Sequence, residues 1–379
     1  MFAYQKTNRY FAQTGNGFED LAGNEIESLG GADVKKTYRG VYFQADIKTL
    51  YRINYRSRLC TRITAPILRF DCHSTKYLYK TAIKMPWQDL LKKNGSFVIS
   101  ATTSNSKIRH SQYAAQCLKD AIADQFRDTF GERPSVSKED PDLWIDLHID
   151  NNKALISIDT SGESLHKRGY RVASIEAPMQ ESLAAAILSL TQWDGSTPLI
   201  DPMCGSGTLL SEALILYCHI PASFNRTRFG FMSMPDYDPV VWEKVKNEED
   251  KKIKKLPKGL IMGSDISSQA VKAARTNLTM IPHGANVDVQ VKPYQEINGI
   301  QNATIVCNPP YGIRLQKKSD MGLFMEEFGN FLKRKCTGSS AYLYLGKKAL
   351  LKNVGLKPAW KKPLMSGGLD GVLAKYDLY

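Results

Sequence analysis

The chain has 379 residues, of which 42% are hydrophobic, so it can bury more than one core and should form two or three domains. Its net charge of +13 favours a polyanionic partner. The seven scattered cysteines offer no zinc-site spacing, and no apolar run is long enough to cross a bilayer. With no signal segment at its start, we expect a cytoplasmic protein that binds neither membrane nor metal.

Short strands and helices alternate through the first 162 residues, as in small α+β units. The first unit is predicted to have strands at 10–13 and 38–45 and helices at 18–29 and 47–59. The second is predicted to have strands at 96–101, 143–149 and 154–159 and a helix at 112–130. The excess of Lys and Arg lies between residues 34 and 110, so this region is the one expected to meet a polyanion.

Basic residues with aromatic neighbours are candidates for binding the phosphates of a nucleic acid and stacking on its bases. For any single residue, the alternative is a solvated helix face whose aromatic side chains pack inward. Residues 162–174 link the two halves of the chain and add further cations near the groove between them. We interpret His166 in this linker as structural or ligand-contacting rather than as a general base. The candidates are Arg52, Arg56, Arg62, Lys107, Arg109, Lys167 and Arg168.

Residues 198–214 have the pattern of a strand, a glycine turn and a helix, which opens nucleotide-binding α/β sheets. The turn reads D-P-M-C-G-S-G-T at 201–208, and its glycines allow the backbone to approach a ligand closely. It matches neither the dinucleotide pattern G-x-G-x-x-G nor a P-loop. The aromatic and basic segment 222–242 that follows is either a lid over a pocket or a layer of aromatic side chains packed on the sheet.

A second strand at 259–266 ends near Asp265, the position at which such sheets bind ribose hydroxyls. The alternative is that Asp265 only caps the next helix, 269–278. Later strands are predicted at 341–345 and 371–378, with a strand and turn at 359–365 between them.

The apolar strand 303–307 runs into N-P-P-Y at 308–311, the most informative motif of the chain. The two prolines stiffen a turn that presents the Asn308 side-chain oxygen, a backbone carbonyl and the Tyr311 ring. Two acceptors suit the two N–H groups of a planar exocyclic amine, and the ring can stack on its base. The alternative is a proline-rich turn in which Tyr311 only packs, but the three motifs occur in the order that a functional site requires.

Such acceptors matter because the lone pair of an exocyclic amine is delocalised into its heterocycle. Hydrogen bonds that favour a pyramidal nitrogen make the lone pair available for attack on an electrophile held in line. No strong base is needed before the attack, and the proton can leave afterwards.

With these motifs, the chain resembles the S-adenosylmethionine (SAM)-dependent THUMP-domain RNA guanine-N2 methyltransferases, a family that includes the amino-terminal methyltransferase half of bacterial RlmL. The resemblance covers essentially the whole chain. It rests also on D-T-S-G at 159–162, L-H-K-R-G-Y-R at 165–171, A-P-M-Q-E-S-L-A-A-A at 177–186 and the continuation of N-P-P-Y through Gly312 and Arg314. It implies an α/β fold with a ferredoxin-like part at 1–55, a THUMP domain at 56–162, and a Rossmann-like methyltransferase domain at 163–379 that opens with a linker, 163–178.

The resemblance also implies roles for individual residues. The target base would be held by Asn308, Pro309, Pro310 and Tyr311, and Arg314 would touch RNA or close the site. One departure is V-K-P-Y-Q at 291–295, where many methyltransferases have an acidic residue, so Tyr294 and Gln295 become the candidates to stack on or accept from the adenine. The expected SAM-binding residues are Asp201, Pro202, Cys204, Gly205, Ser206, Gly207, Thr208, Asp265, Ile266, Asn308 and Glu181.

The activity implied by the resemblance is methylation of the N2 amine of a guanine, with 23S ribosomal RNA as the expected substrate and the target base extruded into the pocket. Guanine-N2 methylation of tRNA and adenine-N6 methylation remain alternatives, because N-P-P-Y serves any planar exocyclic amine. A catalytically inactive assembly factor that binds RNA is a rival of another class, and the intact Asp201, Asp265 and Asn308 argue against it. Since the chain ends at Tyr379, we expect no counterpart of RlmL's second methyltransferase half.

Overall fold

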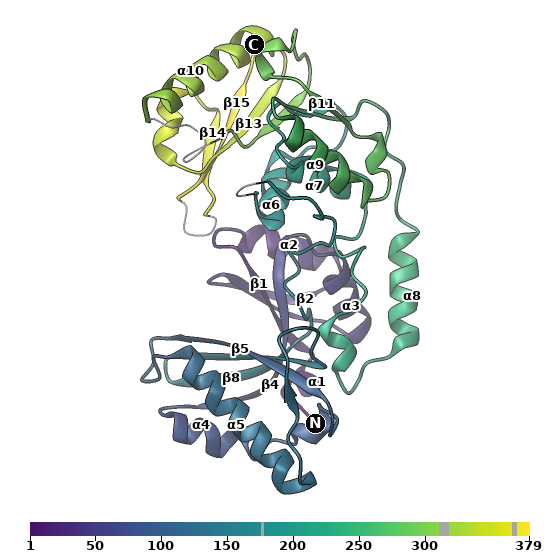
Figure 1. Ribbon diagram of the computed structural model, residues 1–379, viewed down its shortest axis with the longest axis vertical. Coiled ribbons are helices and arrows are strands. Elements are labelled where there is room, and N and C mark those ends of the chain that lie inside the picture. The colour runs from purple at the N-terminus through teal and green to yellow at the C-terminus, as the bar shows by residue number, and fades with distance from the viewer. Residues whose placement is uncertain (176–177, 311–317, 366–369) are drawn as a thin grey trace.

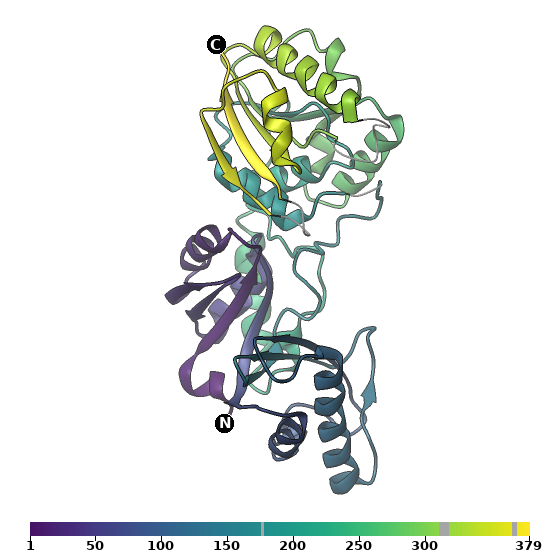
Figure 2. The same ribbon diagram turned by 90° about the vertical axis from the view of Figure 1, so that its left-hand side faces the viewer.

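The computed structural model describes residues 1–175, 178–310, 318–365 and 370–379, with the backbone alone for 318–320. The chain forms two sheets that lie one beyond the other along the long axis of the molecule (Figure 1, Figure 2). The first sheet is built from residues before 160, and the second from residues after 198. The α/β fold class is therefore confirmed.

The first sheet is continuous across the two predicted α+β units, because the long strand β4 pairs with β1 on one side and with β8 on the other. The predicted strands are present, but the strands β2, β4 and β6 and the helices α1 and α4 were not predicted. β2 is exposed along most of its length, and β4 changes register next to Pro66, so neither shows a clean alternation. In spatial order the strands are β2 (Ala32–Thr37), β3 (Gly40–Gln44), β1 (Arg9–Thr14), β4 (Cys60–Asp71), β8 (Lys153–Asp159), β7 (Leu143–Asp150), β5 (Ser96–Ser104) and β6 (Ser135–Val136).

Helices pack on this sheet in two groups. α4 and α5 pack against each other, and α5 also packs against β5. α2 contacts β2 and β3 at the opposite edge. The bounds are α1 (Ala3–Thr7), α2 (Glu19–Ser28), α3 (Ile47–Arg56), α4 (Thr75–Ala82) and α5 (Ser111–Phe130).

The second sheet is parallel except for β15, which runs antiparallel to both of its neighbours. Its order reverses direction between β9 and β12, which makes that junction a topological switch point. The strands are β11 (Asp288–Val291), β10 (Ile261–Asp265), β9 (Leu199–Asp201), β12 (Thr304–Cys307), β13 (Ser340–Leu345), β15 (Val372–Asp377) and β14 (Trp360–Pro363). The helices of this half are α6 (Glu181–Thr191), α7 (Thr208–Tyr217), α8 (Pro239–Asp250), α9 (Ser268–Thr279) and α10 (Lys318–Lys335).

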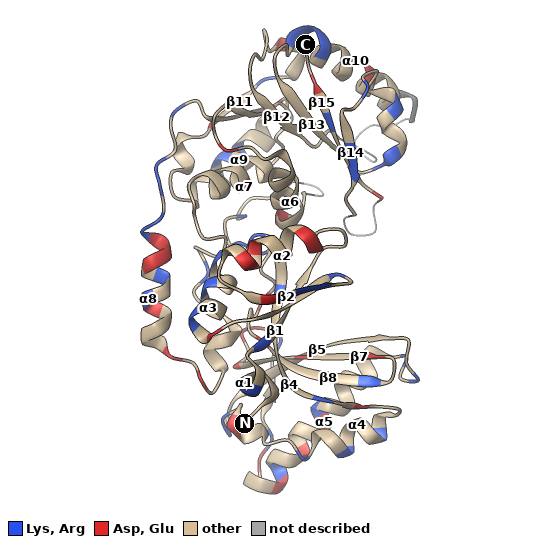
Figure 3. Cartoon of the chain, turned by 180° about the vertical axis from the view of Figure 1, so that it is seen from behind, with Lys and Arg blue, Asp and Glu red and all other residues tan. Residues whose placement is uncertain are grey.

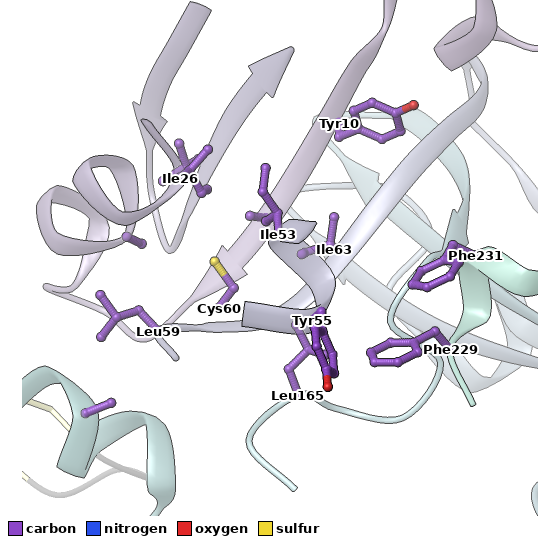
Figure 4. Close-up of a cluster of buried hydrophobic side chains, with 14 of the residues drawn as sticks. Tyr10, Ile26, Ile53, Tyr55, Leu59, Cys60, Ile63, Leu165, Phe229 and Phe231 are labelled. Carbon is purple, nitrogen blue, oxygen red and sulfur yellow. The ribbon is translucent and has the colours of Figure 1, made fainter. Parts of the chain in front are cut away.

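The segment 222–242 is neither a lid nor a layer on its own sheet. Phe231 packs on Tyr51 with ring centroids 4.5 Å apart, and Trp242 packs edge-on against Tyr55 at 5.3 Å. Figure 4 shows Phe229 and Phe231 beside Tyr55 in this cluster. The segment therefore fastens the second half of the chain to α3 of the first half, and α8 continues alongside α3 (Figure 1).

Ion pairs reinforce the contact between α3 and α8. Glu249 is 1% exposed and accepts from Arg52 Nε at 3.0 Å and from Arg56 Nη1 at 3.3 Å. Figure 3 shows the mixed charges of α8 alongside α3. A buried carboxylate engages both guanidinium groups, so RNA would have to compete with Glu249 for them. The RNA contacts of Arg52 and Arg56 stay predictions.

The linker is held by an arginine that we predicted to bind RNA. Arg168 is buried, with its Nε 3.3 Å from Glu212 Oε1 on α7. Its other nitrogens donate to the carbonyl oxygens of Leu165 at 2.7 Å, Ser57 at 3.4 Å and Arg58. A side chain that is only 1% exposed cannot reach RNA in this conformation, so we correct the role of Arg168 to a structural one.

Candidate active site

The carboxyl ends of β9, β10, β11 and β12 converge on a cavity of about 460 Å³ at the switch point. Parallel strands place ligands at this edge of a sheet. Most of the predicted cofactor residues line the cavity: Asp201, Pro202, Cys204, Gly205, Ser206, Thr208, Asp265, Ile266 and Asn308.

The glycine turn after β9 forms the floor of the cavity. Gly205 and Gly207 both have positive φ, 55° and 80°, and a Cβ on Gly207 would lie 3.0 Å from Ala274 Cβ on α9. The Gly205 N–H donates to Asp265 Oδ2 at 2.9 Å, which ties the turn to the end of β10. Only glycine permits this conformation and approach without strain, so the backbone itself is exposed to a ligand.

Asp201 is a buried carboxyl group at the end of β9. Burial raises its pKa to about 8; the negative charge of Asp265 adds to this, and the hydrogen bond from the Met203 N–H opposes it. That bond joins Met203 N and Asp201 Oδ1 at 3.1 Å. The site therefore holds a carboxyl group that ionises near neutral pH when no ligand is bound.

A pH dependence of stability follows from this pKa. The folded chain binds more protons at Asp201 than the unfolded chain between pH 3.8 and about 8. The free energy of unfolding of the ligand-free protein should therefore fall as pH rises through that window. Asp201→Asn keeps an acceptor for Met203 N and should remove this part of the slope in thermal melts recorded at several pH values. An identical slope in the variant would show that another group is responsible.

The far side of the cavity is formed by the loops after β10 and β11. Asp265 Oδ1 accepts from Ser267 N at 2.9 Å, and Pro293, Tyr294 and Gln295 line the wall. The Tyr294 ring lies edge-on to Phe324 of α10, with centroids 6.0 Å apart. The positions proposed for contact with adenine therefore do face the cavity.

Asn308 follows β12 at the mouth of the cavity. Its Oδ1 is buried and accepts no hydrogen bond within the described part of the chain. A buried acceptor without a donor is costly unless a ligand supplies one. Pro310 also lines the cavity, while Tyr311 and Arg314 lie outside the described residues, so their predicted roles stay predictions.

Three of the predicted residues do not line this cavity. Gly207 and Pro309 shape the backbone behind it, and the buried Glu181 pairs with Arg171 at 3.0 Å. Arg171 also donates to Met179 O at 2.7 Å, so this pair braces a wall of the cavity. Pro178 also lines the cavity, from a motif to which no cofactor contact was assigned at that position. Further lining residues were not predicted because they carry no motif of their own: Ile175, Gln269, Ala270 and Phe324.

The other residues predicted to bind RNA differ in exposure and in their ion pairs. Lys107, Arg109 and Lys167 are exposed, whereas Arg62 is partly buried and pairs with the buried Asp159. The structure therefore leaves the first three available for phosphate contacts.

The residues of the cavity fit SAM. The lining includes the carboxyl groups of Asp201 and Asp265, which are acceptors suited to an ammonium group and ribose hydroxyls. A glycine turn leaves room for backbone contact, and aromatic and apolar side chains form the remaining wall. A Rossmann-like sheet with an antiparallel β15 and this cavity at its switch point defines a SAM-dependent methyltransferase.

The chain belongs to the family described as RMKL-like, methyltransferase domain, which matches residues 168–375. A THUMP domain matches residues 72–159, and an RlmL ferredoxin-like domain matches residues 9–64. The predicted family is thus confirmed.

Relatives of known name agree. The protein slr0064 of Synechocystis, whose name provisionally assigns it to the RNA methyltransferases, is 35% identical over 100% of this chain and 99% of its own length. Ribosomal RNA large subunit methyltransferase K/L of Syntrophotalea carbinolica is 33% identical over 98% of this chain, which spans 53% of that relative. The chain is therefore a SAM-dependent methyltransferase of the RNA methyltransferase family, and it spans about half the length of its K/L relatives.

Solved structures resemble the whole chain. SMU.472, provisionally a methyltransferase and complexed with SAH, aligns over 98% of both chains with a TM-score of 0.86 and 27% identity. A Listeria monocytogenes protein described as a predicted N6-adenine-specific DNA methylase aligns with a TM-score of 0.85 and 26% identity over 98% of this chain and 96% of its own. Within the described part of this chain, no helix is long and apolar enough to cross a membrane.

Asp265→Ala is expected to weaken SAM binding about 10- to 100-fold, because hydrogen bonds to a charged group contribute about 1.5–3 kcal/mol. Calorimetric titration of SAM measures the change. Asp288→Ala, at an exposed position on β11, is the matched control and should bind as the wild type does. Equal affinities for the wild type and Asp265→Ala would remove Asp265 from the cofactor site.

Proposed function

We propose that the chain methylates the exocyclic N2 amine of a guanine in RNA, with 23S ribosomal RNA as its substrate. The observation that carries the proposal is the buried Asn308 Oδ1, which lies in the lining of the cofactor cavity and accepts no hydrogen bond from a described residue. Names among the relatives support the choice of RNA: several are large-subunit ribosomal RNA methyltransferases K/L. The resemblance to the guanine-N2 enzymes supports the choice of atom.

Asn308 would act by accepting a hydrogen bond from the target amine. A second N–H of that amine would donate to a backbone carbonyl of the rigid Pro309–Pro310 turn. Together these bonds fix the orientation of the nitrogen. Such orientation can lower the activation barrier by about 7–11 kcal/mol. SAM, when bound, supplies the electrophilic methyl group.

No side chain has to remove a proton before the attack. His166, the histidine of the linker, is not among the described residues that line the cofactor cavity. Burial and the surrounding cations lower its pKa to about 4, so it is a weak base. The proton of the methylated amine can leave to water once the product has formed.

The test uses purified protein, labelled SAM and RNA from cells that lack the enzyme. Ribosomal and transfer RNA are separated after reaction, and the labelled fraction is digested to nucleosides. Label in N2-methylguanosine from 23S RNA is the expected result. The same nucleoside from tRNA would identify tRNA as the substrate instead. Label in N6-methyladenosine would identify the adenine N6 amine as the target. No label despite bound SAM would favour an RNA-binding assembly factor.

A further inference from the structure

A second cavity of about 470 Å³, here called the junction cavity, lies where the first sheet meets the methyltransferase half. Its walls come from the loop after β1, the turn between β2 and β3, strand β4, the linker and the start of α6. The lining residues that matter for the argument are Asn16, Tyr38, Arg39, Arg62, His166 and Gln180.

The junction cavity and the cofactor cavity are lined by adjoining parts of the chain. Pro178 and Met179 line the cofactor cavity, whereas Gln180 and Leu183, directly after them, line the junction cavity. The side toward β14 is closed by Met365, whose Sδ lies 3.1 Å from Asn16 Nδ2. A polymer that delivers a base to one cavity is therefore well placed to enter the other.

The charge of the junction cavity suits an anion. Its described lining contains two arginines and no carboxylate. The charge of Arg62 is balanced by the buried Asp159, and Arg62 Nη1 also donates to Gly162 O at 3.0 Å. The Arg39 guanidinium, in contrast, forms no ion pair with any described residue.

The position of Arg39 is fixed by its backbone. It sits in the tight turn between β2 and β3 with a φ of 55°, and its N–H donates to Glu19 Oε1 at 2.9 Å. Its neighbour Tyr38 is 77% exposed, although large aromatic side chains are usually buried. The turn therefore brings a cation and an exposed aromatic side chain to the lining of one cavity, a combination that proteins use to bind nucleotides.

Polar groups complete the lining. His166 Nδ1 lies 2.7 Å from Ser164 Oγ, which leaves Nε2 for a ligand. Burial and nearby cations lower the pKa of His166 to about 4, so the ring is neutral at physiological pH. With the amides of Asn16 and Gln180, it offers both donors and acceptors to the edge of a base.

We propose that the junction cavity binds an unpaired nucleotide of the RNA substrate that flanks the target base, with Arg39 on its phosphate and Tyr38 stacked on its base. The volume lies within the range of about 300–1,000 Å³ that is usual for ligand sites. This inference rests on the function proposed above and extends it from the methylated nucleotide to the neighbouring strand.

The test measures RNA binding directly, without methyl transfer. A fluorescently labelled single-stranded RNA of mixed sequence is titrated with the full chain at several salt concentrations. Arg39→Gln should weaken binding about three- to tenfold and lower the slope of log affinity against log salt by about one. Tyr38→Ala should weaken binding about fivefold or more, and Tyr38→Phe should restore it.

Two controls make the outcome specific. Arg334→Gln removes an exposed arginine in the last turn of α10. It should leave RNA affinity within about twofold of the wild type. SAM affinity should be unchanged in every variant, which calorimetry checks. Wild-type RNA affinity in both Arg39→Gln and Tyr38→Ala, or an equal loss in Arg334→Gln, would overturn the proposal. Because binding is the readout, a wild type that binds RNA but labels none would count against the proposed function alone.

Discussion

Asn308→Ala is expected to lower kcat for methyl transfer about 100- to 1,000-fold, the usual cost of losing one preorganised hydrogen-bonding group from an active site. The reason is the isolation of Asn308 Oδ1, which is buried and accepts no hydrogen bond from a described residue. Such an acceptor is already desolvated before the amine arrives, so little reorganisation opposes its bond to the substrate. Without this side chain, the amine would keep only the backbone carbonyl as an acceptor, and its orientation would no longer be fixed.

Single-turnover rates with saturating SAM measure this loss without interference from product release. Asn308→Asp is the matched variant because it retains an acceptor oxygen, and we expect it to keep more activity than Asn308→Ala. Calorimetry should find SAM bound to both variants within about threefold of the wild-type affinity, because Asn308 is only one contact at the edge of a large site. A rate near that of the wild type in Asn308→Ala would refute the role of amine acceptor.

The second half of the fold and most of the site could be predicted because each motif follows directly on a strand. The runs before Asp201, Asp265 and Asn308 are short and apolar, and parallel strands bring such ends to one edge of a sheet. Local sequence thus determined nine of the predicted cofactor residues that line the cavity. It could not reveal Phe324 on α10, because nothing near that residue in sequence distinguishes it from a core position.

Contacts between distant segments could not be predicted for a different reason. Tyr51 and Phe231 are far apart in sequence, and either could have packed within its own half of the chain. The environment of Arg52, Arg56 and Arg168 was ambiguous for the same reason. A basic residue is usually exposed, but it can be buried where a buried carboxylate lies near it. Only the structure shows that Glu249 and Glu212 are those carboxylates.

The burial of the pair Arg168–Glu212 leads to the largest expected effect on stability. Arg168→Met should lower the free energy of unfolding by about 3–5 kcal/mol, because the buried carboxyl group of Glu212 would lose its cation. Among the described residues, one oxygen of Glu212 already has no hydrogen-bond partner, and the other would keep only the hydroxyl of Tyr170 at 3.1 Å. Urea unfolding of the full chain, followed by intrinsic fluorescence, measures the change.

Lys167→Met provides the matched control, because Lys167 is the exposed neighbour of Arg168 and should change stability by less than about 0.5 kcal/mol. The double variant Arg168→Met with Glu212→Leu should be more stable than Arg168→Met alone, since no buried charge is then left without a partner. If the destabilising effects of the two single substitutions add up in the double variant, lost packing rather than the uncompensated charge dominates.

Arg168 also joins the carbonyl oxygens of the first half to α7, whose first turn lines the cofactor cavity. Arg168→Met should therefore weaken SAM binding as well, although Arg168 does not itself line that cavity.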